Sequence, residues 1–133
     1  MFKKWVIMIL FVLLPGSSLA ADKWTTQDIV LEIIWEGLHF IDTGTTLGIS
    51  EDPNKYEMNP IMGRHPNREA IWLYMGLGAI LHPLVVNYLP RNYYFEWLDL
   101  NIPARTIFQS ISIGMSGGCA ANNVLKFGFT LHY

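Results

Sequence analysis

The sequence predicts an all-α protein, in which a cleaved N-terminal signal peptide precedes a bundle of three transmembrane helices. Three observations predict this fold. Hydrophobic residues make up 51% of the chain and charged residues only 15%, whereas about 25% of the residues in an average soluble protein are charged. The chain begins with the residue order of a signal peptide. Three long segments with helical patterning follow, and two of them contain long uncharged stretches.

Length, charge and cysteine content further restrict the number of domains, the possible partners and the possible disulfide bonds. The 133 residues correspond to one domain. A formal net charge of -2 gives no basis for a nucleic-acid partner, so we expect none. Cys119 is the single cysteine and rules out an intrachain disulfide. The expected partner is therefore the lipid bilayer. Binding to another protein and assembly into a homo-oligomer are both compatible with the sequence.

The N-terminal segment has the three parts of a signal peptide. Lys3 and Lys4 precede an apolar run from Trp5 to Leu14, and small residues suited to cleavage follow at Ser18 and Ala20. The apolar run is about half of the roughly 20 residues that a spanning helix needs. We therefore predict cleavage after residue 20, which divides the chain into a signal peptide (1–20) and a membrane domain (21–133). The alternative is an uncleaved anchor helix.

This division gives a direct prediction. N-terminal sequencing of the expressed protein is expected to begin at Ala21 or close to it, because signal peptidase cuts after small residues. An intact Met1 in the membrane fraction would show instead that the segment is retained as a fourth helix.

The three predicted helices cover about residues 27–48, 69–89 and 103–127. The stretches from Ile71 to Leu89 and from Thr106 to Leu125 contain no Asp, Glu, Lys or Arg, and both of the later segments are long enough to span a bilayer. The first segment is less apolar, because each ionised carboxylate at mid-bilayer costs roughly 3 kcal/mol. Pro103 suits the start of the third helix.

The polar residues of the first and third segments fall on single helical stripes, as expected for bundle helices with protected polar faces. The first stripe contains Asp28, Glu32, Glu36, His39, Thr43 and Thr46. The third-segment stripe contains Arg105, Gln109, Ser112, Ser116, Cys119 and Asn123. Ion pairing between the two stripes is the simplest expectation, with Arg105 facing the acidic residues that begin the first helix.

The candidate site consists of acidic, histidine and amide side chains that this bundle would bring together. Its members are Glu32, Glu36, His39, Asp42, Glu57, Asn59, His82, Arg105 and Asn123. Glu36, His39 and His82 are predicted to converge, because His82 has a matching depth in the second helix. Four interpretations stay open: a divalent metal held by these three side chains, a proton relay, a substrate pocket, or a structural hydrogen-bonded stripe. No residue is assigned a catalytic role.

The connection between the first and second helices carries an unusual sequence, Tyr56-Glu57-Met58-Asn59-Pro60-Ile61-Met62-Gly63-Arg64-His65-Pro66-Asn67. Its prolines and glycine restrict the backbone to a defined path. We expect this loop to fold back under the first helix, so that Glu57 and Asn59 close the inner side of the candidate site.

Asp42, Thr46, the Glu-x-Asn-Pro-x-x-Gly-x-His-Pro loop that begins at Glu57, His82 and Asn123 resemble a group of small uncharacterised membrane proteins from bacterial and phage genomes. The resemblance covers nearly all of the chain after the signal peptide. It implies a signal peptide and a three-helix membrane body, and it implies no assigned activity.

The functional expectation is a small inner-membrane protein, multi-pass, with its mature N-terminus outside. The loop between the first two helices would face the cytoplasm, which the positive-inside rule favours weakly. We expect a structural or accessory factor of the envelope. The alternatives are a membrane-embedded metal-dependent enzyme and a phage-type pore-forming or exclusion protein, and whether the chain is an enzyme stays open.

Overall fold

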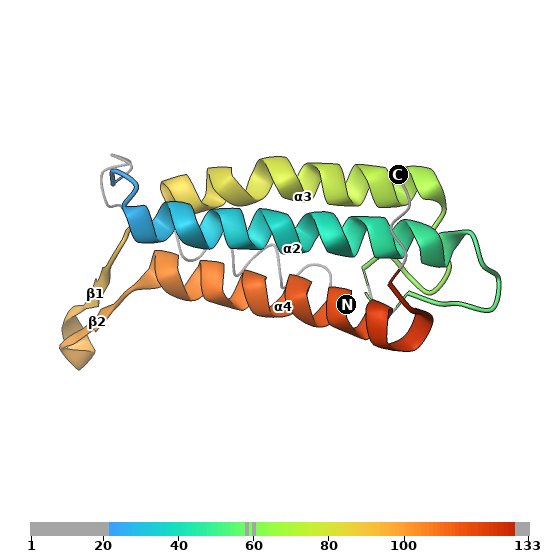
Figure 1. Cartoon of the computed structure of the whole chain (residues 1–133). Coiled ribbons are helices and arrows are strands. Elements are labelled where there is room, and N and C mark those ends of the chain that lie inside the picture. The colour runs from blue at the N-terminus through green and yellow to red at the C-terminus, as the bar shows by residue number, and fades with distance from the viewer. Residues whose placement is uncertain (1–21, 58, 60, 130–133) are drawn as a thin grey trace.

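The computed structural model describes residues 22–57, 59 and 61–129, and these form three long helices and one short hairpin (Figure 1). The elements in order are α2 (Thr26–Ser50), α3 (Arg68–Tyr88), β1 (Tyr93–Phe95), η1 (Glu96–Leu98), β2 (Leu100–Ile102) and α4 (Ala104–Phe127). The predicted signal peptide and its cleavage site lie outside the described residues.

The three helices begin and end within two residues of the predicted positions, a difference typical of helix boundaries. Thr25 caps α2 in a capping box, in which its hydroxyl accepts from the Asp28 amide and its own amide donates to the Asp28 carboxylate. The Asn67 side chain caps α3 by accepting from the Ala70 amide. Local sequence therefore sets where these helices start, and α3 continues through Pro83.

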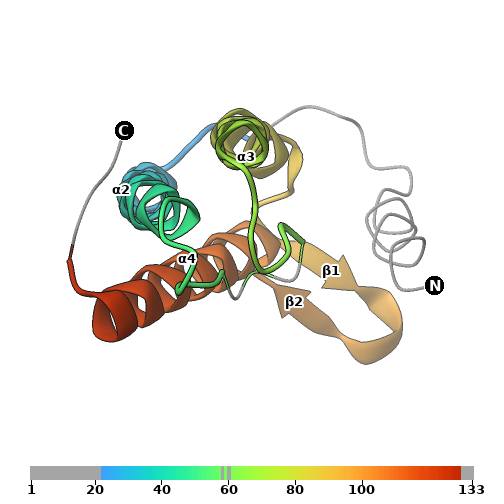
Figure 2. The same ribbon diagram turned by 90° about the vertical axis from the view of Figure 1, so that its right-hand side faces the viewer.

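The helices lie side by side, with α2 between the other two in Figure 1. Both α3 and α4 pack mainly against α2 and have little contact with each other. Figure 2, turned by 90°, shows α4 crossing obliquely beneath α2 and α3. α2 is therefore the helix against which the other two are placed.

The hairpin between α3 and α4 is a feature that the sequence prediction missed. β1 and β2 pair antiparallel, with Tyr94 opposite Asn101, and the hairpin projects from one end of the bundle (Figure 1). Asp99 adopts a left-handed conformation with φ 49° and closes η1, and its carboxylate accepts a 2.7 Å hydrogen bond from the Tyr94 hydroxyl. The all-α prediction is thus confirmed for the body of the protein, with a small sheet added.

Polarity is inverted relative to a water-soluble bundle. The buried apolar cluster is small and consists of Leu47, Ile71 and Met75. More polar and charged residues than apolar ones are buried, while many large apolar side chains on all three helices are exposed. The interior is therefore held together mainly by hydrogen bonds and ion pairs.

Among the described helices, only α3 is both long and apolar enough to qualify as a membrane span by composition. α4 has sufficient length, as predicted, but its serines, glycines and asparagines lower its hydropathy. α2 carries Asp28, Glu32, Glu36 and Asp42. The prediction of three spanning helices is thus supported by composition for one of them.

Candidate functional site

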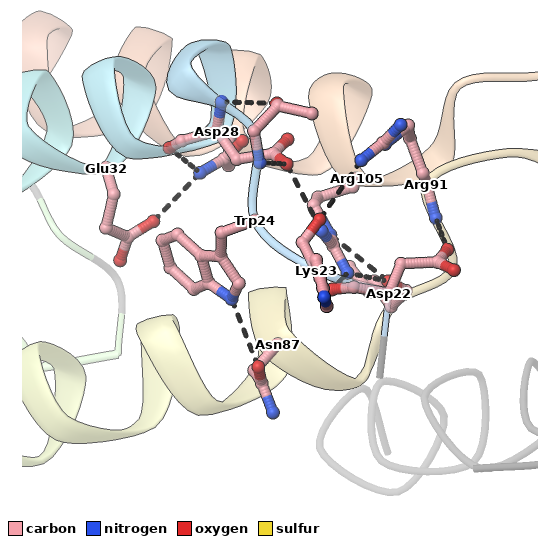
Figure 3. A network of polar contacts seen from close by, with 11 residues as sticks. Asp22, Lys23, Trp24, Asp28, Glu32, Asn87, Arg91 and Arg105 are labelled. Carbon is pink, nitrogen blue, oxygen red and sulfur yellow. Dashed lines mark hydrogen bonds and ion pairs between the residues drawn. The ribbon is translucent and has the colours of Figure 1, made fainter. Parts of the chain in front are cut away.

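Arg105 joins all three helices at the end of the bundle nearest the hairpin (Figure 3). The residue is fully buried, and its Nη1 lies 3.2 Å from Asp28 Oδ2 in α2. Its Nη2 donates to the backbone carbonyl of Leu89, which caps α3, at 2.9 Å. A further bond from Nη2 reaches the carbonyl of Asp22 at 3.2 Å. The predicted pairing of Arg105 with an acidic residue at the start of α2 is confirmed.

The segment before α2 is tied to the same end of the molecule. Trp24 Nε1 donates to Asn87 Oδ1 in α3 at 3.0 Å, and the backbone amide of Arg91 donates to Asp22 Oδ2 at 2.9 Å (Figure 3). Together with Arg105, these bonds link the chain before α2 to the end of α3. This end of the bundle is therefore closed.

Glu32, His82 and Gln109 form the next polar layer, with one side chain from each helix. His82 Nδ1 contacts Glu32 Oε1 at 2.8 Å, and Gln109 Nε2 donates to Glu32 Oε2 at 3.0 Å. Gln109 Nε2 also donates to the carbonyl of Asp28 at 2.9 Å. All three residues are buried, so both oxygens of the Glu32 carboxylate are matched inside the bundle.

This layer corrects the predicted depth of His82. The sequence prediction placed His82 level with Glu36, but its partner is Glu32, one helical turn nearer the hairpin. One turn is about 5.4 Å along a helix, and depth counted from helix ends takes no account of how far one helix is shifted along another. Packing between α2 and α3 sets that shift.

Aromatic stacking occupies the middle of the bundle. The Trp35 ring stacks on His82 with centroids 3.6 Å apart and on His39 with centroids 4.7 Å apart. Phe108 stacks on His82 at 5.0 Å. The His39 ring donates from Nε2 to the carbonyl of Met75 at 2.9 Å. Trp35 was absent from the sequence-derived site, although it shares a helical face with Glu32 and His39, three residues before it and four after.

His39 also fits closely against α3. A Cβ atom added at Gly78 would lie 3.2 Å from His39 Nε2, closer than ordinary packing allows. The glycine therefore admits the imidazole to the backbone of α3, where it reaches the Met75 carbonyl. This use of a small residue in a helix interface matches the close approach that such residues permit.

The far end of the bundle holds a second polar cluster around Asn123. Its Nδ2 donates to Asp42 Oδ1 at 3.3 Å and to the hydroxyls of Thr45 and Thr46 at 3.2 and 3.3 Å. Thr46 in turn donates to Glu57 Oε2 at 3.0 Å. This cluster joins α2 to α4 and brings the loop residue Glu57 into the interior.

The loop between α2 and α3 folds back under the bundle, as predicted. Glu57 is buried, and its second oxygen accepts from the Asn59 amide at 2.8 Å. The Asn59 side chain donates to the hydroxyl of Tyr74 in α3 at 3.3 Å. The positive φ of Gly63, 81°, lets the loop turn so that the Arg64 carbonyl accepts from the Glu57 amide at 2.8 Å.

A cleft of about 410 Å³ lies beside these layers and is lined by all three helices and Asn59. His39 and Asp42 of α2 line it together with Ser112 and Ser116 of α4. Tyr74, Leu77, Gly78 and Leu81 contribute from α3. The cleft therefore reaches two of the candidate residues of α2 and one of the loop.

The predicted metal-binding trio gains no support from this geometry. Glu36 lines a groove between α2 and α3 with His39, but His39 is bonded to the Met75 carbonyl and His82 to Glu32. No group of three His, Cys, Asp or Glu side chains within the described part of the chain could hold a metal ion. The remaining members of the candidate site divide between the layer of Glu32, the cluster of Asn123 and the end closed by Arg105.

The chain matches no protein-family model, no curated protein and no solved structure. The resemblance to small membrane proteins therefore stays a prediction.

Proposed function

We propose that this chain is a small integral membrane protein whose three helices cross the bilayer and that it serves the envelope as a structural or accessory factor. The observation that carries the proposal is the inverted polarity of the bundle. Polar side chains fill its interior while large apolar side chains cover its surface. Lipid removes the cost of exposing that surface, and it favours internal pairing of polar groups.

The exposed apolar side chains occur at mid-helix on every helix. Ile33 of α2 is 66% exposed, Ile80 of α3 62% and Met115 of α4 67%. Water-soluble monomers rarely expose contiguous apolar patches of more than a few hundred Å². A bilayer is the environment in which such a surface is stable without a further protein partner.

α2 and α4 need each other in order to span. Each ionised carboxylate at mid-bilayer costs roughly 3 kcal/mol on insertion scales. Asp28 is matched by Arg105, and Glu32 by His82 and Gln109. The polar stripes that make these helices poor spans by composition are the same stripes that hold the bundle together, so the helices are expected to insert as a unit.

The distribution of residues at the two ends favours an orientation with the hairpin outside. Trp97 and Tyr94 of the hairpin are exposed, as expected for aromatic residues at a membrane interface. Lys55, Arg64 and Arg68 lie at the opposite end, in or next to the loop between α2 and α3. Basic residues favour the cytoplasmic side, so we place that loop inside and the mature N-terminus outside, in the inner membrane.

Membrane integration and orientation are tested by extraction and by single-cysteine labelling. The protein is expected to stay in the membrane pellet after alkaline carbonate treatment and to dissolve in detergent, because its apolar surface needs lipid. In a Cys119→Ser background, Asn92→Cys should react with an impermeant maleimide in spheroplasts. Asn54→Cys should react only after lysis.

Each outcome bears on a separate part of the proposal. Release of the protein by carbonate would overturn membrane integration. The reverse labelling pattern, with Asn54→Cys reactive in intact spheroplasts, would leave integration in place and invert the orientation. Both positions are exposed in the structure, so a difference in reactivity reports the side of the membrane.

A further inference from the structure

The cleft beside α2 opens sideways between α3 and α4. These two helices have little contact with each other, and Figure 2 shows them on different sides of α2. Leu77 and Leu81 of α3 and Met115 of α4 line the cleft and are also exposed on the outer surface. In a protein that spans the bilayer, this opening faces the acyl chains of the lipid.

The buried part of the cleft lining includes polar side chains beside Trp35 and Met75. His39 and Asp42 come from α2, and Ser112 and Ser116 of α4 also line the cleft. Asp42 is buried and is held from the side of α4 by Asn123 Nδ2 at 3.3 Å. The cleft thus has an apolar mouth and a hydrogen-bonding interior, which is the pattern of a small-molecule site.

The charged side chains that line the cleft restrict which polar head groups a ligand can have. Its lining includes the carboxyl group of Asp42 and contains no lysine or arginine among the described residues. A carboxylate or sulfonate head would therefore meet no cationic partner there and would lie against an acidic side chain. A head that donates hydrogen bonds would be matched by Asp42 and by the serine hydroxyls.

We propose that this cleft binds a single-chain amphiphile whose polar end donates hydrogen bonds, such as a protonated amine or a hydroxyl, to Asp42. The apolar chain leaves between Leu81 and Met115 into the bilayer. This inference rests on the proposed membrane integration, because only then does the mouth of the cleft face lipid. The volume of about 410 Å³ lies within the range of small-ligand pockets.

The selectivity of binding must come from the polar end of the ligand. The apolar chain is surrounded by hydrocarbon both in free lipid and in the mouth of the cleft, so it gains little from binding. The hydrogen bond to Asp42 distinguishes the site from bulk lipid. Changing the acidic side chain is therefore expected to affect binding much more than changing residues on the outer, lipid-facing surface.

Photolabelling of the protein in phosphatidylcholine nanodiscs tests the proposal. The probe is dodecylamine with a diazirine in its chain, and adducts are mapped by mass spectrometry of peptides. Adducts are expected at Leu81 and Met115, and excess dodecylamine should compete while dodecane sulfonate should not. Asp42→Asn should reduce these adducts about tenfold or more, the effect of losing a charge-assisted hydrogen bond.

A second variant and an internal control keep the result decisive. Ser116→Leu narrows the cleft without altering Asp42 and should reduce the same adducts. Adducts at Leu125, which is 86% exposed on α4, should stay constant in both variants. Unchanged labelling at Leu81 and Met115 in both variants, or equal competition by the sulfonate, would overturn the proposal.

The failure of this inference and the failure of the proposed function are distinguishable. Carbonate extraction shows beforehand whether wild type and variants are integrated in the membrane. An integrated protein without selective adducts contradicts the binding site alone. A protein that carbonate releases contradicts the proposed function and this inference together.

Discussion

Replacing Arg105 with alanine is expected to lower the free energy of unfolding by roughly 3–5 kcal/mol, the usual effect of leaving one member of a buried ion pair unpaired. The variant loses the contact with Asp28 and the bonds to the carbonyls of Leu89 and Asp22. These partners belong to α2, to the end of α3 and to the segment before α2. The measurement is SDS-induced unfolding in mixed micelles, followed by circular dichroism.

Two further variants show whether the effect belongs to this position. Arg91→Ala removes an exposed arginine that donates from Nη2 to the Lys23 carbonyl at 3.0 Å, and exposed pairs contribute about 1 kcal/mol or less. Arg105→Lys keeps the charge but lacks the planar fork of donors, so an intermediate loss is expected. Equal stability of the Arg105→Ala and Arg91→Ala proteins would remove the buried pair from the account of the fold.

The pair of Glu32 and His82 is expected to give the second large effect. His82→Leu leaves one oxygen of a buried carboxylate without its partner. Glu32→Leu leaves His82 Nδ1 without its partner and removes one of the two acceptors of Gln109 Nε2. Each single change should cost roughly 3 kcal/mol or more. The double variant should lose less than the sum of the two, because an apolar pair of similar size replaces the whole interaction. The expected coupling is about 1–3 kcal/mol.

Glu36→Leu provides a matched control one turn along the same helix. Glu36 is only partly buried in a groove between α2 and α3 and forms no hydrogen bond or ion pair with any other residue that the structure describes. Its replacement should therefore cause none of the loss of stability expected for Glu32→Leu and His82→Leu. Strict additivity of the Glu32→Leu and His82→Leu losses would show that the two side chains do not interact.

Much of the architecture could be predicted from local sequence. The extent of α2, α3 and α4 follows from hydrophobic patterning and from the caps at Thr25 and Asn67. The two polar stripes follow from the helical repeat alone. The opposition of Arg105 and Asp28 could be predicted as well. Both lie near helix starts, and two successive reversals of chain direction bring the starts of α2 and α4 to the same side.

The details of the candidate site could not be predicted in the same way. Whether His82 meets Glu32 or Glu36 depends on a shift of one turn between α2 and α3, and no local propensity encodes that shift. Trp35 was missed because a buried tryptophan looks like an ordinary apolar residue until two imidazoles are found stacked on it. The hairpin was missed because its strands have only three residues each.

The sequence by itself determined which residues are helical and which face of each helix is polar, because both depend on contacts within a few residues along the chain. Only the tertiary structure decided which polar groups pair and where a cleft remains. Those outcomes depend on how far each helix is shifted and tilted on α2. Side chains distant in sequence set that geometry, as His39 does where it packs against Gly78, and α3 and α4 remain apart over the cleft as a result.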